Sequence, residues 1–277
     1  MSWSVTRDLD VFLAAAGVFL HARPAEHSVQ LSVLDTLRIR GLRFYGVPPL
    51  FGWWLGEEGA VGGVLLRTPP HPLHLTALPA QAVAPLAELI SGAEDRPDTV
   101  EVVRGNAAAF AAAWPGKIRT GRASRLHRLK ALEPPEPIPP GRVRTATPAD
   151  RELLIAWGEA FTHEAGGSAG DTAALVDDRL SHEGFALWER EDGTPVSVAS
   201  TTRRVAGAVR VSYVYTPPEH RRRGYAAAVT AAVSARAQEE GAREVVLFTD
   251  LANPTSNEIY RRIGYRPVLD RLALHPS

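Results

Sequence analysis

Residues 216–228 read TPPEHRRRGYAAA, where a histidine and three consecutive arginines directly precede a glycine and a run of small residues. The residues before this stretch, AVRVSYVY (208–215), alternate as a β-strand does. Residues 224–240 are rich in alanine and are followed by Gly241, a typical helix stop. The sequence therefore predicts a strand, a tight turn and then a long helix.

The junction between this strand and this helix is predicted to bind an anion. The first turn of a helix presents backbone N–H groups without partners, and the positive end of the helix dipole lies at the same place. Gly224 has no side chain to block close approach, and Ala226 keeps the next turn nearly as open. The backbone from Arg221 to Ala226 can therefore wrap a diphosphate.

The overall charge favours a local role for these arginines. The 31 Lys and Arg residues balance 31 Asp and Glu residues, so the formal net charge is zero. A solvated basic turn or a nucleic-acid patch is the alternative, but acidic residues lie close along the chain, at Glu239, Glu240 and Glu244. The triple-glycine fingerprint of dinucleotide-binding dehydrogenases is absent. We expect no nucleic-acid partner.

This junction and the residues that follow it resemble the Gcn5-related N-acetyltransferase (GNAT) superfamily. Its acetyl-CoA loop reads Gln or Arg, two residues, Gly, one residue, then Gly or Ala, and Arg221, Gly224 and Ala226 fill that pattern. The block EVVLFTDLANPTSNEIYRRIGYRPV (244–268) lies where the family places its fifth strand and fourth helix. The resemblance covers residues 142–275 well and the first half only in outline. It implies a mixed α/β fold, acetyl-CoA (coenzyme A) as acyl donor, and no metal.

The resemblance also implies a reaction, the direct attack of a primary amine on the acetyl thioester in a ternary complex. Tyr260 matches the family's proton donor to the departing thiolate, and the alternative is a half-buried helix aromatic. Glu164 is the candidate base, and His163, Glu183, Tyr213, Ser212 or a chain of waters are alternatives. A backbone N–H near Tyr215 is expected to face the thioester oxygen. The residues expected to bind the cofactor are Val214, Tyr215, Thr216, Arg221, Arg222, Arg223, Gly224, Tyr225, Ala226, Asn253, Ser256 and Asn257.

The chain is long enough for two domains, and a proline-rich segment divides it. Residues 133–141 read EPPEPIPPG, which predicts an extended connector. Similar successions of strand and helix signals on both sides indicate a duplication. We expect a degenerate GNAT-like domain at 1–132, a linker at 133–141 and a catalytic domain at 142–277. The final stretch, RPVLDRLALH (266–275), is predicted to be a strand pair or hairpin.

The first half lacks the signals of a cofactor site. Its corresponding stretch, LTALPAQAVAPL (75–86), has neither the arginines nor the glycine of the second half. His71 and His74 are three residues apart, but no third ligand accompanies them at a suitable spacing. We therefore expect no metal site.

Composition indicates the setting of the protein. No cysteine is present, which excludes disulfides, thiolate metal sites and cysteine nucleophiles and suits a cytoplasmic protein. The apolar run 11–20 is about half as long as a membrane span needs to be. Frequent arginine and alanine suggest a bacterial gene. The expected protein is a monomeric or homodimeric N-acetyltransferase acting on a small-molecule or protein amine, and the alternative is a non-catalytic acyl-CoA-binding or regulatory module.

Overall fold

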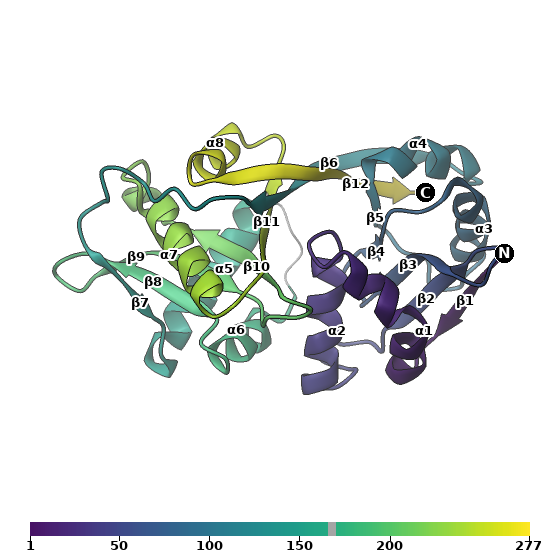
Figure 1. The fold of residues 1–277 in the computed structure, drawn as a ribbon, viewed down its shortest axis with the longest axis horizontal. Coiled ribbons are helices and arrows are strands. Elements are labelled where there is room, and N and C mark those ends of the chain that lie inside the picture. Colours follow the sequence, from purple (N-terminus) through teal and green to yellow (C-terminus); the bar gives the residue numbers. More distant parts are fainter. Residues whose placement is uncertain (166–169) are drawn as a thin grey trace. The chain divides into compact units, whose positions relative to one another are not determined.

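The computed structural model describes residues 1–165 and 170–277, and its contacts divide the chain into two units (Figure 1). The first unit comprises Met1–Leu126, Asp250–Ala252 and Val268–Ser277, and the second comprises His127–Thr249 and Asn253–Pro267. The chain therefore passes between the units more than once, and its C-terminal residues belong to the first unit. The boundaries expected for independently folding domains, at 132 and 142, stay a prediction.

The same succession of elements occurs twice along the chain. The first copy runs β1 (Ser2–Thr6), α1 (Leu9–Ala22), α2 (Ser28–Arg40), β2 (Leu50–Leu55), β3 (Val61–Arg67), β4 (Leu73–Leu75), α3 (Ala80–Ser91), β5 (Val100–Val103), α4 (Arg104–Ala113) and β6 (Ile118–Leu129). The second runs β7 (Arg142–Thr145), α5 (Arg151–Glu164), α6 (Thr172–Leu180), β8 (Phe185–Glu189), β9 (Pro195–Thr201), β10 (Ala208–Tyr215), α7 (Tyr225–Glu239), β11 (Glu244–Asp250), α8 (Pro254–Arg262) and β12 (Tyr265–Pro276).

Strand pairing repeats in the same way. In the first copy β1–β2, β2–β3 and β3–β4 are antiparallel and β4–β5 is parallel. In the second copy β7–β8, β8–β9 and β9–β10 are antiparallel and β10–β11 is parallel. The mixed sheets and the repeated order confirm the predicted α/β fold class with two tandem copies of one plan.

The last strand corrects one prediction from the sequence. Residues 266–275, predicted as a strand pair or hairpin, lie within one strand of 12 residues, β12. This strand pairs antiparallel with β5, from Arg271 opposite Val103 to Leu274 opposite Val100. The stretch therefore pairs with a strand about 170 residues earlier in the chain and does not fold back on itself. The alternation of its own residues cannot predict this partner.

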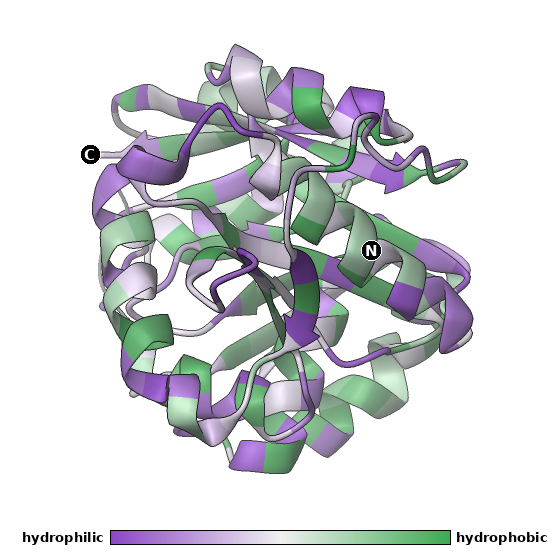
Figure 2. Ribbon diagram, turned by 90° about the vertical axis from the view of Figure 1, so that its left-hand side faces the viewer, coloured by the Kyte–Doolittle hydropathy of each residue, from purple (hydrophilic) through white to green (hydrophobic). Residues whose placement is uncertain are grey.

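The second unit has helices on both faces of its sheet, as the alternation along β8 illustrates. Phe185 and Leu187 pack in a cluster with α5 and α6, whereas Ala186 and Trp188 pack in another with α7 and α8. Figure 2 shows hydrophobic and hydrophilic residues alternating along the helices, as expected for elements with one buried face. The helices packed on both faces of the sheet therefore hold β10 in place, and β10 ends at Tyr215, directly before the predicted loop.

The first unit is built on the same principle. Residues of α3 and α4 pack with those of β3, β4 and β5 in one hydrophobic cluster. On α1, Phe12 stacks against Phe51 of β2 with ring centroids 5.0 Å apart. In the described parts of the chain, no helix combines the length and the hydropathy needed to cross a bilayer.

Candidate active site

The strand that leads into the predicted loop parts from its parallel neighbour. The pairing of β10 with β11 runs from Ala208 opposite Glu244 to Val211 opposite Leu247, although both strands continue. On its other side β10 pairs with β9, but the register shifts by one residue between Ser212 and Tyr215. Residues 212–215 therefore form a β-bulge whose edge towards β11 has no strand partner.

The loop after the bulge presents a row of backbone donors. A short 3-10 helix (Pro218–His220) is followed by Arg222 with φ 60° and Gly224 with φ 82°. Gly224 caps α7, and the first intrahelical bond of α7 is from the Ala228 N–H to the Gly224 carbonyl, at 3.0 Å. Within the described parts of the chain, the backbone N–H groups of residues 222–224 have no recorded acceptor. With the first turn of α7, they form a concave set of donors suited to an anion.

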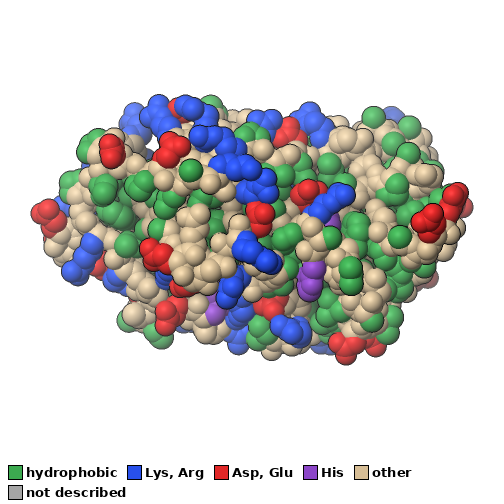
Figure 3. Space-filling model, viewed as in Figure 1, with side chains coloured by type: hydrophobic (Ala, Val, Ile, Leu, Met, Phe, Trp, Pro, Cys, Tyr) green, Lys and Arg blue, Asp and Glu red, His purple; other side chains and the backbone are tan. Residues whose placement is uncertain are grey.

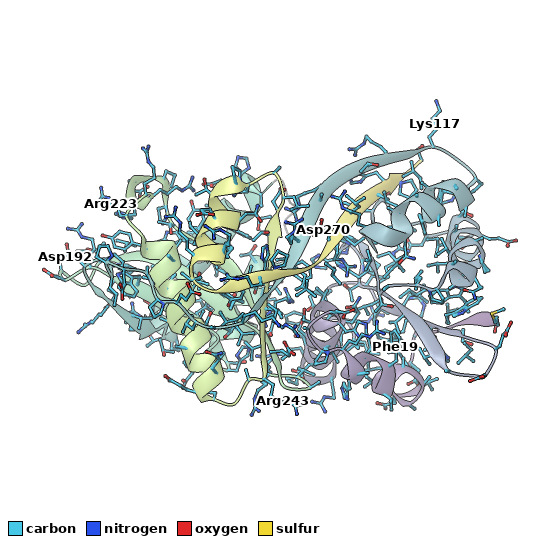
Figure 4. The ribbon with its side chains drawn as sticks, turned by 45° about the horizontal axis from the view of Figure 1, so that its top comes forward. Phe19, Lys117, Asp192, Arg223, Arg243 and Asp270 are labelled. Carbon is cyan, nitrogen blue, oxygen red and sulfur yellow. The ribbon has the colours of Figure 1, made fainter. Side chains whose placement is uncertain are left out.

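The three arginines of the loop have different surroundings. Arg221 donates from Nε to the Thr216 carbonyl at 2.9 Å and pairs through Nη2 with both carboxylate oxygens of Glu164, at 2.8 and 2.6 Å. Arg222 and Arg223 are exposed and have no acidic partner among the residues that the structure describes. Figure 4 shows Arg223 at the N-terminal end of α7, and Figure 3 shows further basic side chains gathered over α8.

Glu164, the predicted base, lies at the C-terminal end of α5 against the loop. Besides Arg221, its carboxylate accepts a hydrogen bond from the Tyr215 hydroxyl at 3.2 Å. The Arg221 guanidinium also lies 5.8 Å from the centre of the Tyr215 ring. The structure therefore brings three predicted site residues into contact: Glu164 of α5, Tyr215 of β10 and Arg221 of the loop.

Tyr260, the predicted acid, is a buried residue of α8. Its side chain is 9% exposed and packs in the cluster with α7, with its ring 6.2 Å from that of Tyr265. Burial raises the pKa of Tyr260, against a smaller opposing effect of the neighbouring Thr230 hydroxyl. The phenol is therefore protonated at neutral pH, which is the form that a proton donor requires.

The polar residues at the start of α8 are bonded to one another. The Asn253 side chain caps α8 by accepting from the Ser256 N–H at 3.0 Å. The Asn257 amide donates to the Asn253 carbonyl at 2.7 Å and accepts from the Thr249 hydroxyl at 2.7 Å. His127 on β6 is 3.1 Å from that hydroxyl. Asn253 is therefore the N-cap of α8, and binding of a cofactor by these residues stays a prediction.

Three residues around the bulge were not assigned to the cofactor site from the sequence. The Ser200 hydroxyl donates to the Ser212 carbonyl at 2.9 Å, and the Ser197 hydroxyl donates to the Tyr215 carbonyl at 3.1 Å. The Tyr213 hydroxyl donates to the Leu154 carbonyl of α5 at 2.7 Å. Burial raises the pKa of Tyr213, which opposes the role of base considered for it. No signal in the sequence marks these residues, because ordinary alternation continues through the bulge.

The corresponding place in the first unit is closed. The parallel pairing of β4 with β5 ends at His74 opposite Glu101, and only residues 76–79 separate β4 from α3, which begins at Ala80. Both backbone polar groups of Leu78 are held by the Asn106 side chain on α4, which accepts from its N–H at 3.0 Å and donates to its carbonyl at 2.8 Å. The Leu78 side chain is buried in the core of the unit. Leu78, which follows β4, and Asn106, which follows β5, thus connect the ends of these two strands.

A cavity of the second unit lies at the N-terminal end of β10. It has a volume of about 240 Å³, and its lining includes Arg203, Arg204 and Arg236. These arginines are engaged by Asp178, by the Gly241 carbonyl and by the Glu183 carbonyl, respectively. Its lining also includes Glu183, one of the alternatives considered for the base, and none of the residues expected to bind the cofactor. In the described parts of the chain, no group of three or more potential ligands is arranged to hold a metal ion.

Comparison with known proteins agrees with this geometry. No curated protein matches the sequence. A solved Drosophila protein aligns with a TM-score of 0.67 and 13% identity over 97% of this chain and 95% of its own. A GCN5-related N-acetyltransferase from Sphaerobacter thermophilus aligns with 0.64 and 17%, over 98% and 94%.

A third solved structure contains a GCN5-related glucosamine N-acetyltransferase region in a fungal multi-domain β-N-acetylglucosaminidase. It aligns with a TM-score of 0.60 and 14% identity, over 99% of this chain and 38% of its own. At such identities these likenesses concern the fold. The model of the acetyltransferase (GNAT) family matches residues 151–265, which span the bulge, the loop and the start of β12. Residues 151–265 are thus a domain of the acetyltransferase (GNAT) family.

Proposed function

We propose that this protein is an acetyl-CoA-dependent N-acetyltransferase that moves an acetyl group to a primary amine in a ternary complex. The observation that carries the proposal is the parting of β10 from β11 beside the open amides of residues 222–227. Coenzyme A joins an extended, amide-containing arm to a diphosphate. An unpaired strand edge that ends at an anion-binding turn complements both parts.

The residues present fit this group. The open donors at the start of α7 suit the diphosphate, and a Cβ built on Gly224 would come no closer than 3.8 Å to its neighbours, on Pro139. We assign the diphosphate to the backbone of 222–226 and to the side chains of Arg222 and Arg223, with Arg221, paired with Glu164 in this structure, as a third cation that the anion would attract. One side of the amide-containing arm is assigned to the strand edge formed by Val214, Tyr215 and Thr216. The opposite side of the arm is assigned to Asn253, Ser256 and Asn257.

Two side chains handle the protons in this proposal. Acetyl-CoA, when bound, supplies an activated acetyl thioester. Glu164 takes the proton that the acceptor amine loses as its nitrogen forms the new bond to carbon. The Tyr260 hydroxyl donates its proton to the sulfur as the carbon–sulfur bond breaks. A backbone N–H near Tyr215 stabilises the negative charge on the carbonyl oxygen, a contribution of about 3 kcal/mol for one such donor.

The experiment that tests the proposal measures thiol release from acetyl-CoA in the presence of a panel of amines. The panel contains amino sugars, because one structural relative carries a glucosamine N-acetyltransferase region, together with polyamines, amino acids and peptides with free amino groups. Amine-dependent thiol release that saturates is the expected result. Tight binding of acetyl-CoA without turnover of any amine would instead favour a non-catalytic acyl-CoA-binding module.

A further inference from the structure

The bulge of β10 holds a conformation that its residues do not favour by themselves. Tyr213 has φ 47°, in the left-handed region where residues with a Cβ are uncommon. Neither of its neighbours, Ser212 and Val214, has a positive φ. Such a conformation persists only where the surrounding structure determines it.

Contacts on the α5 face fix Tyr213. Its hydroxyl donates to the Leu154 carbonyl at 2.7 Å, and its ring packs edge-on against Phe185 and at a tilt against Phe161, with centroids 5.5 and 5.6 Å away. On α5, Gly158 lies beside it, because a Cβ there would lie 3.5 Å from the Tyr213 hydroxyl oxygen. The side chain is therefore held at its tip and on its faces.

Contacts from β9 fix the two ends of the bulge. The register shifts between Ser212 and Tyr215, and the carbonyls of these two residues each accept from a serine hydroxyl of β9. Ser200 and Ser197, which supply these hydroxyls, are 1% and 0% exposed. Hydrogen bonds to buried carbonyls cannot be replaced by water, so the two serines tie both ends of the bulge to β9.

We propose that Tyr213, Ser197 and Ser200 are positioning residues that lock the bulge, so that the unpaired edge of residues 212–215 meets the acyl group in one fixed geometry. This inference rests on the proposed acetyl transfer. The lock holds the edge assigned to the arm and contacts neither the backbone of 222–224 nor Tyr260, so its loss is expected to lower the rate of acyl transfer much more than the affinity for the cofactor.

The test compares kcat with the affinity for acetyl-CoA in Tyr213→Phe and Ser200→Ala. A displacement of about 1 Å at a reacting centre can cost on the order of 100-fold in rate, so kcat is expected to fall about 10- to 100-fold. The calorimetric Kd is expected to change much less than kcat, because the diphosphate contacts at the anion-binding turn are untouched. Ser200→Thr, which keeps the hydroxyl, is expected to retain most of the rate.

Thr36→Val is the matched control for stability. Thr36 is a buried threonine of α2 whose hydroxyl donates to the Ser32 carbonyl at 3.0 Å, far along the chain from the bulge. It is expected to lower the melting temperature about as much as Ser200→Ala does, with an unchanged kcat. Backbone amide shifts of Val214 in ¹⁵N spectra are expected to move in Tyr213→Phe and not in Thr36→Val.

Different results would overturn the proposed lock and the proposed function. Wild-type protein that turns over an amine, with Tyr213→Phe and Ser200→Ala equally active, overturns the lock and leaves the proposed function standing. A fall of kcat in the Thr36→Val control as large as in the bulge variants also overturns it. Wild-type protein that does not bind acetyl-CoA overturns the proposed function, and the lock with it.

Discussion

The guanidinium group of Arg221 and the carboxylate of Glu164 form an ion pair, with 2.6 Å between Nη2 and Oε2. Both side chains are about two-fifths exposed, so the pair contributes little to stability. Its interest is functional, because an anion bound at the loop competes with Glu164 for Arg221. Binding of a diphosphate would then release the carboxylate that we propose as the base.

Glu164→Gln tests this coupling. Removal of a general base typically costs about 10²- to 10⁴-fold, so kcat is expected to fall by roughly that amount. The affinity for acetyl-CoA is expected to stay the same or to rise, because a competing anion has been removed. Steady-state kinetics and calorimetry on the same variant separate the two effects. A weakened affinity with an unchanged kcat would make Glu164 an anchor for the loop and not the base.

Gly224→Glu tests the placement of the diphosphate. A carboxylate at the start of α7 repels a bound anion by about 4 kcal/mol for charges 4 Å apart near a protein surface. Such a repulsion corresponds to a loss of affinity of roughly 1,000-fold, measured by calorimetry with coenzyme A.

The control for this substitution is Gly193→Glu, in the β8–β9 turn. Gly193 has φ 81° against 82° for Gly224, and a Cβ built on it meets nothing within 4 Å. Both variants therefore carry the same backbone strain, about 1–2 kcal/mol, and are expected to lose similar thermal stability. Equal affinity for coenzyme A in the two variants would show that the loop is not the diphosphate site.

Local signals in the sequence predicted most of the second unit. Asp192 and Gly193 mark the β8–β9 hairpin, Gly241 marks the end of α7, and Pro254 opens α8, and each signal acts within a few residues. The open amides at Gly224 followed from the same kind of signal. Elements whose positions depend on local backbone preferences are those that one sequence reveals.

Long-range contacts account for what the sequence did not predict. The partner of β12 is β5, and the ion pair of Arg221 joins residues 57 positions apart. The bulge at Tyr213 depends on serines of the neighbouring strand and on a carbonyl of α5. Each of these contacts depends on residues far away in the sequence. Periodicity and motif spacing describe only neighbouring residues, so they cannot predict such contacts.

Tyr260→Phe is expected to lower kcat about 10²- to 10⁴-fold, since it removes the proposed proton donor and keeps the buried ring. Tyr265→Phe is the matched control, because it deletes the hydroxyl of an equally buried tyrosine, bonded to Ser234 at 2.7 Å. This control is expected to lower stability by about 1–3 kcal/mol and to keep its kcat. Similar kcat values for the two variants in the thiol-release assay would exclude Tyr260 as the acid.

Stability is expected to fall as the pH is lowered from about 7 towards 4. Burial lowers the pKa of His27 and of His71, and burial together with Arg203 and Arg179 lowers that of His182 to about 4. Below the ordinary histidine pKa of 6.5, the unfolded chain therefore binds protons that the folded chain does not. The measurement is the urea midpoint as a function of pH.

His182→Gln removes one contribution to this dependence and is expected to make the fall shallower. His21→Gln, at an exposed histidine of α1, is the control for the loss of an imidazole that the fold does not bury. The same slope in wild type and His182→Gln would assign the acid sensitivity to other groups. Asp150, whose pKa is lowered below 3.8, mainly by its hydrogen bond with Arg144, adds to the fall only as the pH approaches 4, because the unfolded carboxyl begins to bind protons there.

The first unit is expected to bind no coenzyme A, so titration calorimetry should give one site per chain. Hydrogen bonds of 3.0 and 2.8 Å between Asn106 and the Leu78 backbone occupy the space beyond the ends of β4 and β5. The corresponding strand of the second unit, β10, has an unpaired edge there. Asn106→Ala deletes both bonds and leaves two backbone groups unpaired, which is expected to cost about 1–3 kcal/mol of stability for each buried group. The affinity and the stoichiometry should not change. Two sites per chain, or a weakened affinity in Asn106→Ala, would mean that the first unit also holds cofactor.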